Sequence, residues 1–165
     1  MTGRKRLPIG IQTFDKIREG NYYYVDKTAL ILSLVQSGTH YFLSRPRRFG
    51  KRLLLDTIKE LFEGNESLFQ GLAIHDHWNW SVKYPVLRFS FGRKNYRQPQ
   101  ALEESLHQQL TQLEQDFTLE RRFNDAGSRF ADLIEKVKVQ TGKPVVVLID
   151  EYDKPILDNI TDSAI

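Results

Sequence analysis

Apolar residues recur along the chain with a helical period in several stretches. Spacings of three, four and seven predict helices from Lys51 to Gly64, from Pro99 to Phe117 and around Phe130 to Val137. A further helix is expected after Asp26, a typical N-cap residue, and it should end at Gly38. These stretches are long enough to cover the face of a sheet.

Short apolar runs between the helices are typical of buried strands. They lie at His40–Ser44, Pro85–Phe91 and Pro144–Ile149. Strands that alternate with helical segments predict an α/β fold with a mainly parallel sheet. Trp78 and Trp80 lie in a stretch with no clear period, and we interpret them as packing residues rather than as a base-stacking platform.

Composition narrows the class of protein. The 165 residues are 40% hydrophobic, which is enough for the core of one domain. No apolar run approaches the ~20 residues of a membrane helix, and the N-terminus lacks a signal-peptide core, so a cytoplasmic location is expected. The absence of cysteine excludes disulfides, thiol nucleophiles and cysteine zinc sites.

Positive charge is concentrated in the first third of the chain. Residues 1–52 contain 11 Lys or Arg against 3 Asp or Glu, whereas the remainder is net negative. Such a distribution favours an anionic partner, either nucleotide phosphates or a nucleic-acid backbone. The alternative interpretation is a solvated basic face.

A Gly-Lys pair separates the run His40–Ser44 from the helix that follows it. Backbone N–H groups at a helix start attract phosphate, glycine allows close approach, and the lysine adds a mobile charge. The full Walker A signature has a glycine where Arg45 stands and Ser or Thr where Arg52 stands, so the hydroxyl that would hold Mg²⁺ is missing. The predicted nucleotide-binding residues are Arg47, Arg48, Phe49, Gly50, Lys51 and Arg52.

Two acids follow the run Pro144–Ile149, as in a Walker B pattern. In this interpretation Asp150 holds Mg²⁺ and Glu151 polarises the attacking water as a general base. The alternative is a buried strand that ends in solvated acids. Asp153 is interpreted as a helix cap, and the pair His75 and His77 lacks a third metal ligand pattern.

Five segments of the chain together carry a family resemblance. They are Leu7–Phe14, Tyr24–Thr28, Ser44–Lys51, Tyr84–Val86 and Asp150–Asp153. With these segments the chain resembles the bacterial AAA-ATPase-like domain family. The resemblance implies a P-loop NTPase-like three-layer sandwich that binds ATP and Mg²⁺, and within it Arg45 is normal. A serine normally follows the lysine, so Arg52 departs from the pattern and places Mg²⁺ coordination and hydrolysis in question.

The resemblance also implies that family members continue past the Asp-Glu pair, commonly into a region similar to PD-(D/E)XK nucleases. Residues 1–165 are therefore expected to form the N-terminal portion of one domain, truncated after the Walker B strand. Open sheet edges pair promiscuously, so the isolated chain is expected to be marginally stable or to need a partner or an oligomer.

Two functional hypotheses follow. The first is an ATP-binding, ATPase-like domain with a degenerate Walker A motif. The second is a non-catalytic module with a vestigial nucleotide site, whose basic N-terminal half binds nucleic acid or a protein.

Overall fold

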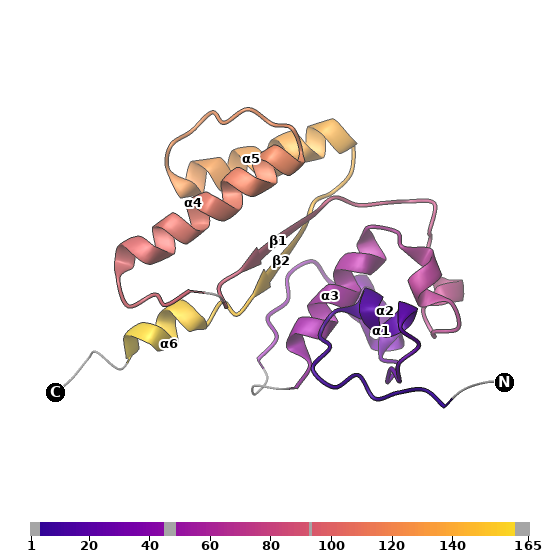
Figure 1. Ribbon diagram of the computed structural model, residues 1–165. Helices are drawn as coiled ribbons and strands as arrows, with labels where there is room; N and C mark the ends of the chain where they lie inside the picture. Colours follow the sequence, from indigo (N-terminus) through magenta and orange to yellow (C-terminus); the bar gives the residue numbers. More distant parts are fainter. Residues whose placement is uncertain (1–3, 45–48, 93, 161–165) are drawn as a thin grey trace. The chain divides into compact units, whose positions relative to one another are not determined.

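The computed structural model describes residues 4–44, 49–92 and 94–160. The chain divides into two compact units, Met1–Lys83 (unit 1) and Tyr84–Ile165 (unit 2), and each is described by itself. Figure 1 labels their elements. No helix in the described ranges is long and apolar enough to cross a membrane.

Helices form the regular structure described in unit 1. The predicted helix after Asp26 is confirmed, and the Asp26 carboxylate accepts a hydrogen bond from the Thr28 N–H at 2.8 Å. The geometric N-cap is the next residue, Lys27. The elements are α1 (Phe14–Glu19), α2 (Thr28–Ser37), α3 (Lys51–Phe62) and two 3-10 turns, η1 (Glu66–Phe69) and η2 (His75–His77).

Aromatic side chains make up much of the core of unit 1. The Phe14 ring packs against Phe69 at a centroid distance of 4.8 Å, and Phe69 packs against Trp80 at 5.1 Å. Phe62 meets Trp78 edge to face at 5.3 Å. Both tryptophans are therefore packing residues, as predicted.

Buried polar contacts fix α1 against α3 in unit 1. The Asp56 carboxylate on α3 is buried and accepts the Phe14 N–H at 2.7 Å, which satisfies a donor in the first turn of α1. Arg18 on α1 donates to the carbonyl oxygens of Leu68 and Gln70 around η1. The start of α3 thus belongs to a helix that is anchored along its length.

A two-stranded parallel sheet lies at the centre of unit 2. Strands β1 (Val86–Ser90) and β2 (Val146–Asp150) pair with Val86 opposite Val146 and Ser90 opposite Asp150. Two long helices, α4 (Pro99–Asp116) and α5 (Ala126–Thr141), follow β1 and cross over to β2. The predicted strands and helices of this unit are confirmed.

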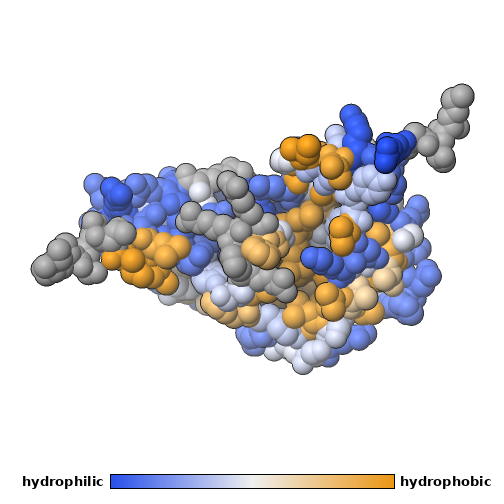
Figure 2. Space-filling model, turned by 90° about the horizontal axis from the view of Figure 1, so that it is seen from below, coloured by the Kyte–Doolittle hydropathy of each residue, from blue (hydrophilic) through white to orange (hydrophobic). Residues whose placement is uncertain are grey.

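Helices α4 and α5 enclose the core of unit 2 with one face of the sheet. Leu87 and Phe89 of β1 pack with Leu110 of α4 and with Leu133 and Val137 of α5. Since side chains alternate along a strand, Arg88 lies on the opposite face of β1. The short helix α6 (Lys154–Ile160) follows β2, and its exposed apolar residues form the orange patch beside the grey C-terminal residues in Figure 2.

A buried arginine joins α4 to α5. Arg129, 2% exposed, donates from Nε and Nη2 to both carboxylate oxygens of Glu114 at 3.0 and 2.7 Å. Nη2 also donates to Thr111 Oγ1 at 2.9 Å, and Nη1 meets His107 Nδ1 at 2.8 Å. The charge is thereby paired and hydrogen-bonded, which burial requires.

The strand predicted at His40–Ser44 is wrong. These residues have no regular strand structure, and Tyr41, Phe42 and Leu43 expose large parts of their side chains. A strand exists only where a neighbouring strand takes its N–H and C=O groups, and an apolar run does not encode that neighbour. The described parallel sheet therefore contains β1 and β2, which fits an α/β fold.

Candidate nucleotide site

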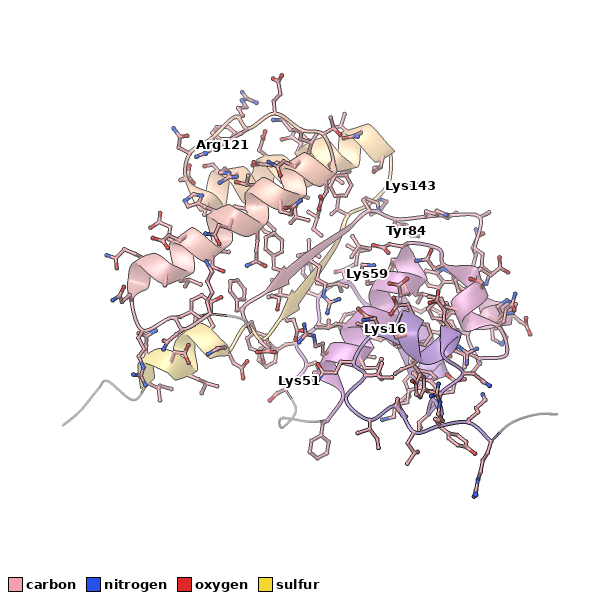
Figure 3. All side chains as sticks on the ribbon, viewed as in Figure 1. Lys16, Lys51, Lys59, Tyr84, Arg121 and Lys143 are labelled. Atoms are coloured by element: carbon pink, nitrogen blue, oxygen red, sulfur yellow. The ribbon has the colours of Figure 1, made fainter. Side chains whose placement is uncertain are left out.

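One group of candidate residues lies in unit 1, at the start of α3. Gly50 precedes the helix with φ 76° and ψ 18°, the left-handed region that favours glycine. Among the residues that the structure describes, a Cβ at Gly50 would meet nothing within 4 Å, so the left-handed backbone is the feature that favours glycine here. Lys51 is the first residue of α3, as Figure 3 shows.

Positive potential gathers at this helix start. No side-chain hydrogen bond caps α3 in the described part of the chain, and its first-turn N–H groups carry the positive end of the helix dipole. The Arg52 guanidinium contacts Gln12 Oε1 at 3.5 Å, and the Phe49 ring is 60% exposed. Arg47 and Arg48 lie outside the described residues.

A second group of candidate residues lies in unit 2, at the carboxyl end of β2, and is called the acidic corner. Asp150 is the last residue of β2 and is 3% exposed. Its backbone carbonyl accepts the Phe91 N–H at 3.1 Å, and Arg88 Nη2 lies 3.8 Å from Asp150 Oδ2.

Glu151 turns the chain sharply out of β2. Its φ is 53°, a left-handed value that is costly for a residue with a side chain. Its carbonyl accepts the Lys154 N–H at 3.1 Å, which closes the turn into α6, and the Asp153 carbonyl accepts the Leu157 N–H. Asp153 therefore stands directly before α6, as predicted for a cap, and its backbone carbonyl accepts a hydrogen bond from the helix.

Tyr96, in the segment after β1, is hydrogen-bonded to α6. The Tyr96 N–H donates to Asp158 Oδ2 at 3.0 Å, and Asn159 Nδ2 donates to the Tyr96 carbonyl at 2.8 Å. The Lys154 ammonium and then the Tyr96 N–H hold the pKa of the Asp158 carboxyl below its ordinary value. Residues on both sides of Glu151 are thus tied to the segment that follows β1.

Comparison with known proteins bears on the candidate residues of both units. The model of a family described as predicted AAA-ATPases matches residues 8–165. The chain belongs to this AAA-ATPase-like family. That description suggests a nucleotide-binding domain.

One curated relative of this AAA-ATPase-like chain is much longer than it. The relative is an "Uncharacterized protein in vnfD 5'region" from Azotobacter chroococcum mcd 1, 58% identical over 159 residues. The match covers 96% of the chain and 31% of the relative, so the chain spans about a third of the relative's length. No solved structure matches the chain.

The acidic corner of the AAA-ATPase-like chain contains two adjacent carboxylates, Asp150 and Glu151. Mg²⁺ is typically bound through one or two carboxylates together with water and phosphate oxygens. The Arg88 guanidinium lies beside Asp150, and the described residues contain no group of three His, Asp or Glu side chains that could hold a metal ion.

The predicted site residues fall into two groups. Gly50, Lys51 and Arg52 lie together at the start of α3, while Asp150 and Glu151 lie together at the end of β2. The sequence analysis missed Arg88, in the middle of β1, and Gly92, two residues after that strand, which meet Asp150 and Glu151 respectively. A lone arginine in an apolar strand was the available signal for Arg88.

Proposed function

We propose that the chain is the ATP-binding portion of an ATPase-like domain with a P-loop sandwich fold. The Gly50 backbone and the Lys51 ammonium bind the β- and γ-phosphates. Asp150 binds Mg²⁺, and Glu151 polarises the attacking water. Arg47, Arg48 and Arg52 add positive charge to the phosphate side of this site.

The observation that carries the proposal is the start of α3. A left-handed glycine followed at once by lysine at the head of a 12-residue helix supports phosphate binding, because it leaves first-turn N–H groups and an ammonium at the helix start. Family membership and the acid pair at the end of a parallel strand support the same function. In open α/β sheets, ligands bind outside the carboxyl ends of the strands.

Hydrolysis in this scheme assigns a separate task to each acid. The water oxygen forms a bond to the γ-phosphorus, the bond from that phosphorus to ADP breaks, and Glu151 takes the proton of the water. Bound Mg²⁺ would neutralise charge that develops on the phosphate oxygens. Because Arg52 replaces the Mg²⁺-binding hydroxyl, we expect the chain to bind ATP and to hydrolyse it slowly.

Calorimetric titration with ATP, in Mg²⁺ and in EDTA, tests the proposal. Lys51→Ala should weaken binding about ten- to hundred-fold, the value of a charged hydrogen bond. Lys16→Ala is the matched control, because Lys16 is an exposed lysine of α1 and its loss changes the net charge equally. Equal affinities of the two variants would overturn the phosphate-binding assignment.

Arg52→Ser tests the magnesium side. The serine hydroxyl should make ATP binding depend on Mg²⁺ and should raise turnover, and Glu151→Gln in the same background should abolish that gain. Turnover that survives Glu151→Gln would remove Glu151 from the mechanism.

A non-catalytic binding module is the second candidate function. Arg4, Lys5 and Arg6 are all exposed, and the exposed apolar residues Leu7 and Ile9 follow them. Such a surface supports binding to an anionic polymer. Titration with single-stranded DNA at two salt concentrations, on the wild type and on a variant with alanine at these three positions, would distinguish this function from nucleotide binding.

A further inference from the structure

Gly92 lies directly under the Glu151 carboxylate. An ideal Cβ built on Gly92 would fall 2.6 Å from both Glu151 Cδ and Oε1, and it would also overlap Oε2. Real Cβ atoms do not approach other heavy atoms so closely. The carboxylate therefore occupies the space that a side chain at position 92 would fill.

Backbone conformation does not explain this glycine. The left-handed glycines of the described chain are Gly10, Gly50, Gly64, Gly71 and Gly142, and Gly92 is not among them. An alanine at position 92 fits its backbone, so the substitution acts through the overlap alone. The overlapping atoms are the far end of a flexible side chain, and the least costly response is that the carboxylate moves.

The main chain of Glu151 has little freedom to accompany that movement. Its left-handed turn is closed by the hydrogen bond from Lys154, and Phe91 bonds to the carbonyl of Asp150 on the preceding residue. Tyr96, four residues beyond Gly92, is held by Asp158 and Asn159 of α6. Phe91 and Tyr96, on either side of Gly92, are thus both hydrogen-bonded to residues 150–159.

We propose that Gly92 is a positioning residue for Glu151. Its missing side chain leaves the space in which the carboxylate lies, and this sets the direction from which Glu151 reaches a water molecule. The proposal rests on the role given to Glu151 in the proposed function. It adds that Gly92, two residues after β1, is required for Glu151 to perform that role.

The test compares Gly92→Ala with Gly127→Ala in the full chain, in wild-type and Arg52→Ser backgrounds. Gly127 is the matched control because its added Cβ would lie 3.6 Å from Asp125 Oδ1, an ordinary contact within the same unit. The readouts are the affinity for ATP, kcat and KM for hydrolysis, and the ¹³C resonance of the Glu151 carboxyl, assigned with Glu151→Gln.

Gly92→Ala should shift the Glu151 carboxyl resonance and lower kcat about 100-fold, the typical cost of misplacing a reacting group by an ångström. ATP affinity and KM should change less than two-fold, because Glu151 is not assigned to phosphate binding. Gly127→Ala should leave all of these readouts unchanged. An unmoved resonance in Gly92→Ala, or a shifted resonance with unchanged kcat, would overturn the proposal.

The spectroscopic arm separates this proposal from the proposed function. If no background hydrolyses ATP, the catalytic role of Glu151 fails, and so does the claim that Gly92 serves it. A shifted resonance would then show that the placement of the carboxylate by Gly92 is correct even though the reaction is not. If hydrolysis occurs and depends on Glu151 but not on Gly92, the proposed function stands and the positioning role falls.

Discussion

The candidate residues of unit 1, called the phosphate side, and those of unit 2, called the acidic side, are constructed differently. The phosphate side consists of backbone amides and the cations Lys51 and Arg52 at the start of α3, after the left-handed Gly50. The acidic side consists of a buried aspartate and a left-handed glutamate, and hydrogen bonds from Phe91 and with Tyr96 hold residues 150–159 around them. The phosphate side is local in sequence, whereas the acidic side depends on contacts between distant segments.

This difference indicates which substitutions should disturb the phosphate side and which the acidic side. A helix start tolerates changes elsewhere in the protein as long as the helix is anchored. The acidic side instead requires β1, β2 and α6 to pack correctly before its carboxylates are in place. Substitutions that weaken unit 2 should therefore affect the acids, while substitutions around α1 and α3 should affect the phosphate side.

The largest effect is expected from Arg129→Ala in unit 2. Removal of the guanidinium leaves the Glu114 carboxylate buried and unpaired, which should cost about 3–5 kcal/mol of the free energy of unfolding. Urea denaturation followed by circular dichroism measures this loss. Arg121→Ala is the control, because Arg121 is exposed and its loss should cost below about 1 kcal/mol.

Equal losses in the two arginine variants would show that the α4–α5 network does not support unit 2. A double variant, Arg129→Met with Glu114→Leu, should recover most of the stability because no buried charge remains unpaired.

Asp56→Ala should give the next largest effect, in unit 1. It leaves the buried Phe14 N–H without its carboxylate acceptor, at a cost of about 1–3 kcal/mol. Protection of α1 amides from hydrogen exchange should fall, whereas protection of β1 and β2 should not. Loss of protection in both units would contradict the inference that the phosphate side depends on packing in unit 1 and the acidic side on packing in unit 2.

Glu151→Gly should stabilise unit 2 slightly. Relief of the left-handed conformation should make this variant about 1 kcal/mol more stable than Glu151→Ala, which removes the same carboxylate but keeps a Cβ. Both variants should be equally inactive in hydrolysis. Equal urea midpoints would show that the φ of Glu151 carries no conformational cost.

Acid should produce the smallest effect through Asp26. Burial acts to raise the pKa of its carboxyl, but hydrogen bonds from Ala73 and Thr28 outweigh burial and lower it. A lowered pKa in the folded state means that the stabilisation is full above the unfolded value, about 4, and is lost as the pH falls through the folded value. Asp26→Asn should flatten this loss in urea midpoints measured from pH 7 to 3, and Asp15→Asn, in the same unit, should not.

Long elements with a strong period could be predicted from the sequence. The apolar stripes of α3, α4 and α5 and the apolar runs of β1 and β2 were sufficient, because burial of one face or of a whole strand leaves a local pattern. Helices α1 and α6 were not predicted. They are six and seven residues long, too short to develop a clear stripe.

The candidate site was predictable only as far as its motifs are local. Gly50, Lys51, Asp150 and Glu151 are adjacent in pairs, so spacing alone marks them. Gly92 directly follows the predicted strand Pro85–Phe91, and no local pattern marks it, because its contact with Glu151 exists only once β1 and β2 lie side by side. The same dependence on a neighbour explains the failed strand at His40–Ser44.

Parallel pairing of β1 with β2 also has a kinetic consequence. Val86 finds its partner at Val146 only after the whole stretch containing α4 and α5 has been brought round, and closing so long a loop is entropically slow. We expect the helical hairpin of α4 and α5 to form first and to serve as the folding nucleus. Leu110→Ala should then slow folding, whereas Leu148→Ala should mainly accelerate unfolding. The corner that carries both acids would thus be among the last parts of the protein to form and the first to open.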